Sequence, residues 1–326
     1  MTTPMTTPTK VPTKEPTQAA AKTRLYLQEV VTRDGLQAEQ VFVPTARKIE
    51  LIDRLSRAGY AKIEVTSFTS PKAIPALADA EAVMAGIERV RGVEYTALIP
   101  NVRGARRAID SRIDEFNLVM STSETHNRSN LKMSREQSFA QLSEVIELAA
   151  EAAIPVNVSL STCFGCPMEG DVPQAEVMRW VDAFARQAVR GVTICDTTGM
   201  AHPAQVAQLC EALVRDFPGL QHTLHFHNTR GMGAANALAA VQNGIVRFDA
   251  SLGGLGGCPY APGATGNVCT EELAHMFELM GHDTGVDVDR LLDAAALLRE
   301  LVGHEVPSQL LKAGKVSRRH AAPVQA

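Results

Sequence analysis

The sequence has few of the residues that specialised architectures require. It contains six cysteines and one tryptophan in 326 residues, and its charged residues, 21% of the total, leave a formal net charge of only −4. Six cysteines in a chain this long do not make a disulfide scaffold, so a reducing, cytoplasmic setting is expected. A pI near 6.2 gives no electrostatic reason to expect nucleic acid or a membrane surface as a partner.

Long apolar runs are also missing, since no stretch approaches the roughly 18 uninterrupted apolar residues that a bilayer span needs. A hydrophobic content of 45% is ordinary for a globular enzyme and excludes a disordered, collagen-like or coiled-coil architecture. Residues 1–22 are rich in Thr and Pro, without the apolar core of a signal peptide or the arginine of a transit peptide. They are predicted to be a disordered tail, and 316–326 a flexible one, which leaves 23–315 as one catalytic domain.

Eight short β-rich runs alternate with helical segments through this domain. In segment 203–216, Val206, Leu209 and Leu213 follow the spacing of one buried helix face. Eight strands, each followed by a helix, predict a (β/α)₈ TIM barrel, with a short helical extension that includes 288–302. A doubly wound sheet is disfavoured because TRDGLQ, not a glycine-rich phosphate loop, follows the first run. The predicted strands are 25–31, 62–66, 93–99, 115–120, 155–160, 191–195, 222–227 and 246–252.

Barrel enzymes carry their chemistry at the C-terminal ends of the strands. The first run leads directly into Arg33 and Asp34. On this fact alone, a catalytic pair and a structural ion pair are equally good interpretations. Glu64 lies among β-branched residues of the second run, where a buried carboxylate needs a partner. The partner that we expect is Arg33.

The seventh run ends in His225 and His227, and the two-residue period of a strand directs both imidazoles to the same side. They could be two satisfied polar residues at a strand end. Their place at the catalytic end, with Asp34 on a strand expected to be adjacent in space, favours a metal site instead. Two imidazoles, a carboxylate and an amide oxygen suit a borderline or hard divalent ion.

A glycine-rich segment, 253–267, follows the eighth run with six glycines and two prolines. It could be a flexible linker, but its place between a strand and the predicted helix 270–280 favours a mobile active-site loop. Cys258 lies inside this loop and is the cysteine with the clearest claim to chemistry. The pair Cys163 and Cys166 lacks a second CxxC or a neighbouring His and is interpreted as two loop thiols.

These motifs resemble the 3-hydroxy-3-methylglutaryl-CoA lyase family. The resemblance rests on SLGGLGGCPYAPGATGN (251–267), TRDGLQ (32–37), IEVTSFTSP (63–71) and GCPMEG (165–170), and it covers about 24 to 303. It implies a metal-dependent TIM barrel, of the group named for an Arg, an Asp and a Glu, that splits 3-hydroxy-3-methylglutaryl-CoA into acetyl-CoA and acetoacetate. It further implies Mg²⁺ or Mn²⁺ as cofactor, an acyl-CoA substrate, a homo-oligomer (dimer or tetramer), and a role in leucine degradation and ketone body formation.

The resemblance also implies a role for individual residues. Arg33 would stabilise the enolate, Cys258 would donate a proton to the departing carbanion, and Glu64 would orient Arg33. The hydroxyl proton could go to Asp34 or to a metal-bound water. The implied metal ligands are Asp34, His225, His227 and Asn267, and the implied substrate-binding residues are Gln37, Asp196 and Thr197.

Two positions depart from the family pattern. Asn228 stands where the family commonly has Asp, and Arg230 stands where other members often have Tyr. Both lie beside an implied ligand, so they are expected to alter metal affinity or substrate choice. A lyase for citramalyl-CoA or a longer branched glutaryl-CoA therefore stays open. A condensing enzyme of the isopropylmalate synthase type ranks lower, because the regulatory domain usual in those chains is not expected here, and a non-catalytic scaffold ranks lower still.

Overall fold

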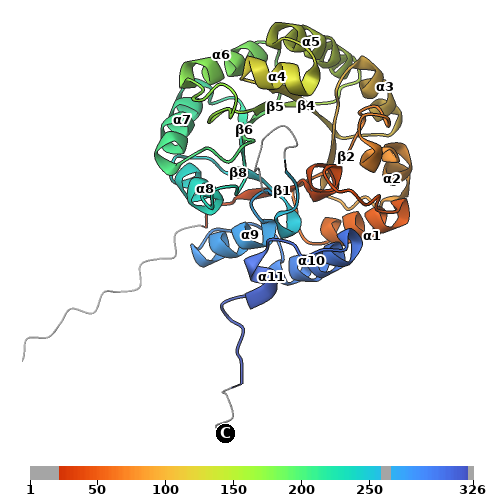
Figure 1. Ribbon diagram of the computed structural model, residues 1–326, viewed down its shortest axis with the longest axis vertical. Coiled ribbons are helices and arrows are strands. Elements are labelled where there is room, and N and C mark those ends of the chain that lie inside the picture. The colour runs from red at the N-terminus through yellow and green to blue at the C-terminus, as the bar shows by residue number, and fades with distance from the viewer. Residues whose placement is uncertain (1–21, 258–265, 322–326) are drawn as a thin grey trace, which may run out of the picture.

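Eight parallel strands close into a barrel in which each strand pairs with the next along the chain and β8 pairs with β1 (Figure 1). The structure is a computed structural model that describes residues 22–257 and 266–321. The strands are β1 (Tyr26–Glu29), β2 (Lys62–Ser67), β3 (Glu94–Leu98), β4 (Glu115–Ser121), β5 (Val156–Ser161), β6 (Gly191–Asp196), β7 (Gln221–Phe226) and β8 (Arg247–Ala250). The predicted TIM barrel is confirmed.

Helices surround this barrel as a ring (Figure 1). The ring consists of α1 (Thr45–Ser56), α2 (Ala80–Gly86), α3 (Val102–Asp110), α5 (Arg135–Glu151), α6 (Gln174–Ala185), α7 (Pro203–Asp216), α8 (Gly233–Gln242) and α9 (Thr270–Leu279). Helix α9 follows β8 and packs against β8 and β1, and the additional helix α4 (Glu124–Leu131) packs against β4 and α5. The C-terminal extension consists of α10 (Val288–Val302), which packs against α9 and α1, and α11 (Gln309–Ala313). The short turns are η1 (Val31–Gly35), η2 (Pro75–Leu77) and η3 (Leu252–Gly254).

Strand β8 illustrates how one strand serves both the apolar core and the barrel lumen. Phe248 and Ala250 are fully buried, and the Phe248 ring packs against Phe277 of α9. The alternate residues, Arg247 and Asp249, face inward, where Asp249 lines a cavity. The two-residue period therefore directs apolar side chains to the helices and polar ones to the lumen.

At the N-terminal end of the barrel, buried charges neutralise one another. Lys62 forms an ion pair with Glu115 and lies 3.4 Å from Glu94, while Arg190 pairs with both carboxylates. Each buried charge has an opposite charge within reach, as a low-dielectric interior requires. In TIM barrels this end contributes to stability, so we assign the network a structural role.

The sequence predicted the element boundaries closely, and the predicted helices 203–216 and 288–302 coincide with α7 and α10. The first strand differs, because β1 ends at Glu29 and a π-helical turn, η1, follows. The predicted tails lie outside the described residues except for Lys22 and 316–321. Within the described parts of the chain, no helix combines the length and apolarity of a membrane span.

Candidate active site and metal centre

Turn η1 places Arg33 between two carboxylates at the C-terminal end of the barrel. Its Nε donates to Glu64 Oε2 at 2.5 Å, and its Nη1 donates to Asp34 Oδ1 at 2.6 Å. The second oxygen of Glu64 accepts from Asn117 Nδ2 at 2.7 Å. Burial opposes charge on Arg33, yet the two carboxylates outweigh it and raise the pKa of the guanidinium. The guanidinium is therefore a permanent charge in a fixed orientation.

Asp34 is linked to Asn267, the last residue of the glycine-rich segment. Asn267 Nδ2 donates to Asp34 Oδ2 at 2.8 Å and to the carbonyl of Leu255 at 3.1 Å. Burial would raise the pKa of Asp34, but Arg33 and the nearby imidazoles lower it to about 2. Asn267 Oδ1 is buried and has no hydrogen-bond partner in the described part of the chain. A buried oxygen of this kind calls for a cation or a donor.

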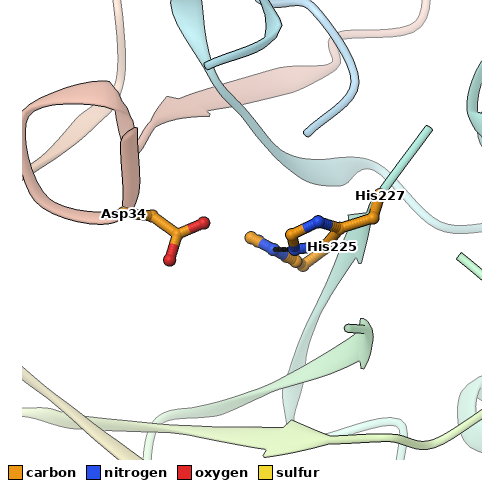
Figure 2. A group of neighbouring side chains, drawn as sticks. All are labelled: Asp34, His225 and His227. Atoms are coloured by element: carbon orange, nitrogen blue, oxygen red, sulfur yellow. Dashed lines mark hydrogen bonds between the residues drawn. The ribbon is translucent and has the colours of Figure 1, made fainter. Parts of the chain in front are cut away.

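The imidazoles of His225 and His227 meet Asp34 at one point. Their Nε2 atoms are 3.2 Å apart, and one ligand atom from each of the three residues lies within 4.8 Å of the others. Figure 2 shows the Asp34 carboxylate directed toward both rings. One correction follows: β1 and β7 are not neighbours, because β8 lies between them. Asp34 reaches the imidazoles because it lies on η1, beyond the end of β1.

The donor set fits a divalent cation. Two imidazole nitrogens and a carboxylate converge, and the unpartnered amide oxygen of Asn267 lies on a side chain bonded to that carboxylate. Mixed nitrogen and oxygen donors are typical of sites for borderline divalent ions, and the oxygens also suit Mg²⁺ and Mn²⁺. The four implied metal ligands are thus brought together.

A cavity of about 580 Å³ opens over this cluster. Its lining divides into a charged floor, a neutral polar wall and an apolar mouth. The floor includes Arg33, Asp34, His225, His227 and Asp249; the wall includes Asn117, Ser159, Ser161 and Thr197; and the mouth includes Phe42, Ile74, Pro75 and Leu131. A concave cavity of this size, lined by both polar and apolar side chains, is typical of a small-molecule site.

The three implied substrate-binding residues occupy different places. Gln37 and Thr197 line the cavity. Asp196 is 1% exposed, and its Oδ1 accepts the N–H groups of Met200 and Ala201 at 2.8 and 3.1 Å. Burial raises the pKa of Asp196 to about 6, although these hydrogen bonds oppose the shift. Asp196 therefore shapes the turn after β6, between two lining residues, Cys195 and Thr197.

The cavity residues that the sequence did not indicate include three with titratable side chains, Asp249, His126 and Cys195. Asp249 Oδ2 lies 3.4 Å from His225 Nδ1. The His126 Nδ1 atom on α4 lies 2.5 Å from Ser121 Oγ, and burial lowers the His126 pKa. Burial raises the pKa of the Cys195 thiol. A carboxylate between the apolar residues of the eighth run was a usable signal for Asp249, whereas no pattern distinguished the other two.

Glu29, at the end of β1, fixes the base of the glycine-rich segment. One of its oxygens, Oε1, accepts the N–H groups of Val31 in η1 and Leu252 in η3, both at 2.9 Å. The other, Oε2, accepts the Tyr60 hydroxyl at 2.5 Å and the Thr270 hydroxyl at 2.9 Å. Burial raises the pKa of Glu29 to about 7, although these bonds oppose it. One buried carboxylate thus ties together the two turns that flank the site.

The predicted catalytic Cys258 lies outside the described residues. Just before it, Gly256 has a φ of +115°, and a Cβ there would lie 2.6 Å from Asn267 Nδ2. Both facts require glycine, since other residues rarely adopt this φ and a side chain would displace the amide. The glycines of this segment therefore allow the backbone to approach the metal-ligand cluster closely.

The two departures from the family pattern stabilise loops. Asn228 Oδ1 accepts the N–H of Gly233, the first residue of α8, at 3.0 Å. Arg230 Nη1 donates to the carbonyls of Thr198 and Gly199 at 3.0 and 2.8 Å. An Asp side chain at 228 would supply the same acceptor. The effect expected on metal affinity or substrate choice stays a prediction.

The chain is similar to known proteins over nearly all of its length. The family model described as HMGL-like matches residues 24–298. Hydroxymethylglutaryl-CoA lyase YngG of Bacillus subtilis (strain 168) is 46% identical over 294 residues, which cover 90% of this chain and 98% of that protein. The structure of an HMG-CoA lyase from Acinetobacter baumannii, in complex with coenzyme A and 3-methylmalate, superposes with a TM-score of 0.90 at 47% identity, covering 94% and 100% of the two chains. The (R)-citramalyl-CoA lyase of Chloroflexus aurantiacus (strain ATCC 29366 / DSM 635 / J-10-fl) is 37% identical over 88% of this chain and 94% of that protein.

Proposed function

Given that the chain belongs to the HMGL-like family of hydroxymethylglutaryl-CoA lyases, we propose that it cleaves 3-hydroxy-3-methylglutaryl-CoA into acetyl-CoA and acetoacetate. The observation that carries this proposal is the cluster of Asp34, His225 and His227, which line a cavity together with Arg33, while Asn267 is hydrogen-bonded to Asp34. The near-complete coverage of lyase relatives supports the same activity. A cytoplasmic homo-oligomer, dimer or tetramer, stays a prediction.

We propose that this cluster holds one divalent cation, Mg²⁺ or Mn²⁺. The support is the set of donors and the partnerless Oδ1 of Asn267, whose amide nitrogen is already committed to Asp34 and Leu255. When bound, such an ion polarises the substrate oxygens and lowers the pKa of the tertiary hydroxyl group. Asp34 is bonded to both Arg33 and Asn267, so it is better suited to hold a cation than to accept a proton.

Arg33 supplies the positive charge for the other half of the reaction. Cleavage of the C2–C3 bond moves negative charge onto the thioester carbonyl of the departing acetyl group. Glu64 and Asp34 hold the guanidinium in place before substrate arrives, so the charge needs little reorganisation during the reaction. Glu64 therefore acts by orienting Arg33.

Cys258 is proposed, on the family resemblance, as the proton donor to the departing carbanion. The residue before it, Gly257, lines the cavity. A thiol is a better proton donor near neutral pH than a serine hydroxyl. The apolar mouth, formed by residues such as Phe42 and Leu131, suits the uncharged arm that joins the thioester to the nucleotide part of coenzyme A.

A second candidate activity is cleavage of citramalyl-CoA, which the relative with that named activity supports. The test is to incubate the purified protein and Mg²⁺ with each thioester and to identify the products by mass spectrometry. We expect acetoacetate and acetyl-CoA from 3-hydroxy-3-methylglutaryl-CoA. If the protein forms pyruvate from citramalyl-CoA and no acetoacetate from 3-hydroxy-3-methylglutaryl-CoA, citramalyl-CoA cleavage replaces the first activity as the proposed function. His225→Ala provides the inactive control.

A further inference from the structure

We propose that Asp249 is a positioning residue that holds His225 with its proton on Nδ1, so that Nε2 faces the metal-ligand cluster. This inference rests on the proposed function, because it assumes that His225 binds the divalent cation. The roles that the family resemblance implies do not include Asp249.

The register of the barrel places the two side chains opposite each other. His225 on β7 and Asp249 on β8 are paired positions of adjacent parallel strands, and both line the cavity. Asp249 Oδ2 lies 3.4 Å from Nδ1 of His225, while Nε2 of the same ring lies 3.2 Å from His227 Nε2. The carboxylate and the cluster therefore contact opposite nitrogens of one imidazole.

A neutral imidazole carries its proton on one nitrogen and a lone pair on the other, and only the lone pair can bind a metal. A carboxylate that accepts from Nδ1–H places the lone pair on Nε2 and also fixes the ring plane. The side chains of His225 and Asp249 are 8% and 12% exposed, so water competes weakly for this contact. Asp249 thereby acts through His225 and need not touch the substrate.

The rigid surroundings of Asp249 favour this role over packing alone. Gln28 on β1 is its register partner on the other side, and the Gln28 amide donates to Thr223 at 3.0 Å. On the cavity side, Asp249 adds to the electrostatic stabilisation of Arg33, which Glu64 and Asp34 dominate. Lys62 also interacts electrostatically with Asp249, but its amine is paired with Glu115 and lies 3.4 Å from Glu94. In the described part of the chain, His225 is the group that lies within ion-pair distance of the Asp249 carboxylate.

The first test reads the tautomer directly. Long-range ¹H–¹⁵N spectra of the full-length protein with ¹⁵N-labelled histidine, with and without Mg²⁺, distinguish the two tautomers, and His225→Gln assigns the signals. We expect the Nδ1–H tautomer for His225 in the wild type and a mixture in Asp249→Asn. An Nε2–H tautomer in the wild type would overturn the inference, even if the variant failed to fold.

The second test measures Mn²⁺ affinity by electron paramagnetic resonance. Asp249→Asn keeps the shape of the side chain and should weaken binding roughly 10- to 100-fold, as is typical when a residue behind a ligand is changed. In a His225→Gln background the same change should have little further effect. Glu94→Gln removes a carboxylate at the opposite end of the barrel and should leave the affinity unchanged.

Affinity of Asp249→Asn within twofold of the wild type would overturn the positioning role while leaving the metal site intact. An equal loss in the His225→Gln background would also overturn it, because Asp249 would then act independently of His225. A wild type that binds no Mn²⁺ would refute the proposed metal site, and with it this inference. Product analysis with the wild type tests the lyase activity separately from both.

Discussion

Replacing Arg33 by Gln should reduce both turnover and stability, and the structure indicates how much each will fall. The guanidinium lies against Glu64 and Asp34, with side chains that are 4% and 12% exposed. Loss of a fixed charge aimed at developing negative charge lowers kcat by about 10²- to 10⁴-fold, or about 3–5 kcal/mol of transition-state stabilisation. We expect this loss with Mg²⁺ saturating.

The stability effect follows from the two carboxylates that Arg33→Gln leaves behind. Breaking a buried ion pair on one side typically lowers the free energy of unfolding by about 3–5 kcal/mol, because the remaining charge stays buried. The position of Arg33 at the strand ends would alone suggest that the fold tolerates the change. Its two buried contacts show instead that the variant should fold with reduced stability.

A double variant separates the two effects. Glu64→Gln removes one of the two carboxylates that Arg33→Gln leaves without a partner, so the double variant should recover part of the lost stability while kcat stays low. Urea unfolding gives the free energy of unfolding, and acetoacetate formation from 3-hydroxy-3-methylglutaryl-CoA gives kcat. Near-normal kcat in Arg33→Gln would refute the catalytic role. Recovery of kcat in the double variant would show that Arg33→Gln lowered kcat only because it left the Glu64 carboxylate without its partner.

Three further predictions concern other parts of the site. Cys258→Ser should lower kcat by about 10²-fold or more with Mn²⁺ still bound. Full activity after complete alkylation of Cys258 would contradict this prediction. Because Cys195 also lines the cavity, the alkylation is done in a Cys195→Ser background. Asn267→Ala should weaken Mn²⁺ binding by at least about tenfold, measured by electron paramagnetic resonance, since it removes the partnerless amide oxygen. The folded-state pKa of Glu29, about 7, lies above its ordinary value of 4.5, so its contribution to stability is complete below about pH 4.5 and is lost as the pH rises through 7. The unfolding free energy of the wild type, relative to Glu29→Gln, should therefore fall by about 3 kcal/mol from pH 4.5 to 8, and parallel pH curves for the two proteins would contradict the assignment.

The fold could be predicted because alternating strand and helix patterns are local. Each β-rich run is short and is bounded by helical segments, and the buried face of 203–216 is visible in its spacing alone. The first strand was the exception. The apolar residues of this run continue to Val31, which predicts a longer strand. In the structure, however, the N–H groups of Asp34 and Gly35 both donate to the Val30 carbonyl and form a helical turn. A hydrophobic pattern does not distinguish these two conformations over so few residues.

Most of the site residues that could be predicted lie at or just beyond the C-terminal ends of strands, which all open on the same face of the barrel. His227 follows β7 directly, and Arg33 lies on η1, just beyond the end of β1. Asp249 lies inside β8, and its relation to His225 depends on the register of two strands, which no sequence pattern states. His126 enters the cavity from α4, a helix at the rim whose position depends on packing. The sequence therefore predicts site residues near the ends of the strands better than site residues inside a strand or on a helix.

Much of the rigidity that the chemistry needs comes from a residue away from the cluster itself. Glu29 Oε1 accepts one N–H from η1, which carries Arg33 and Asp34, and one from η3, where the glycine-rich segment begins. A single buried oxygen thus sets the separation of the two turns. Turn η1 is linked a second time, through the bond between Asp34 and Asn267 at the end of the glycine-rich segment. Two such links constrain the proposed ligands more strongly than either could alone, and Gly256 lets the backbone pass close to Asn267 without a side chain that would displace its amide.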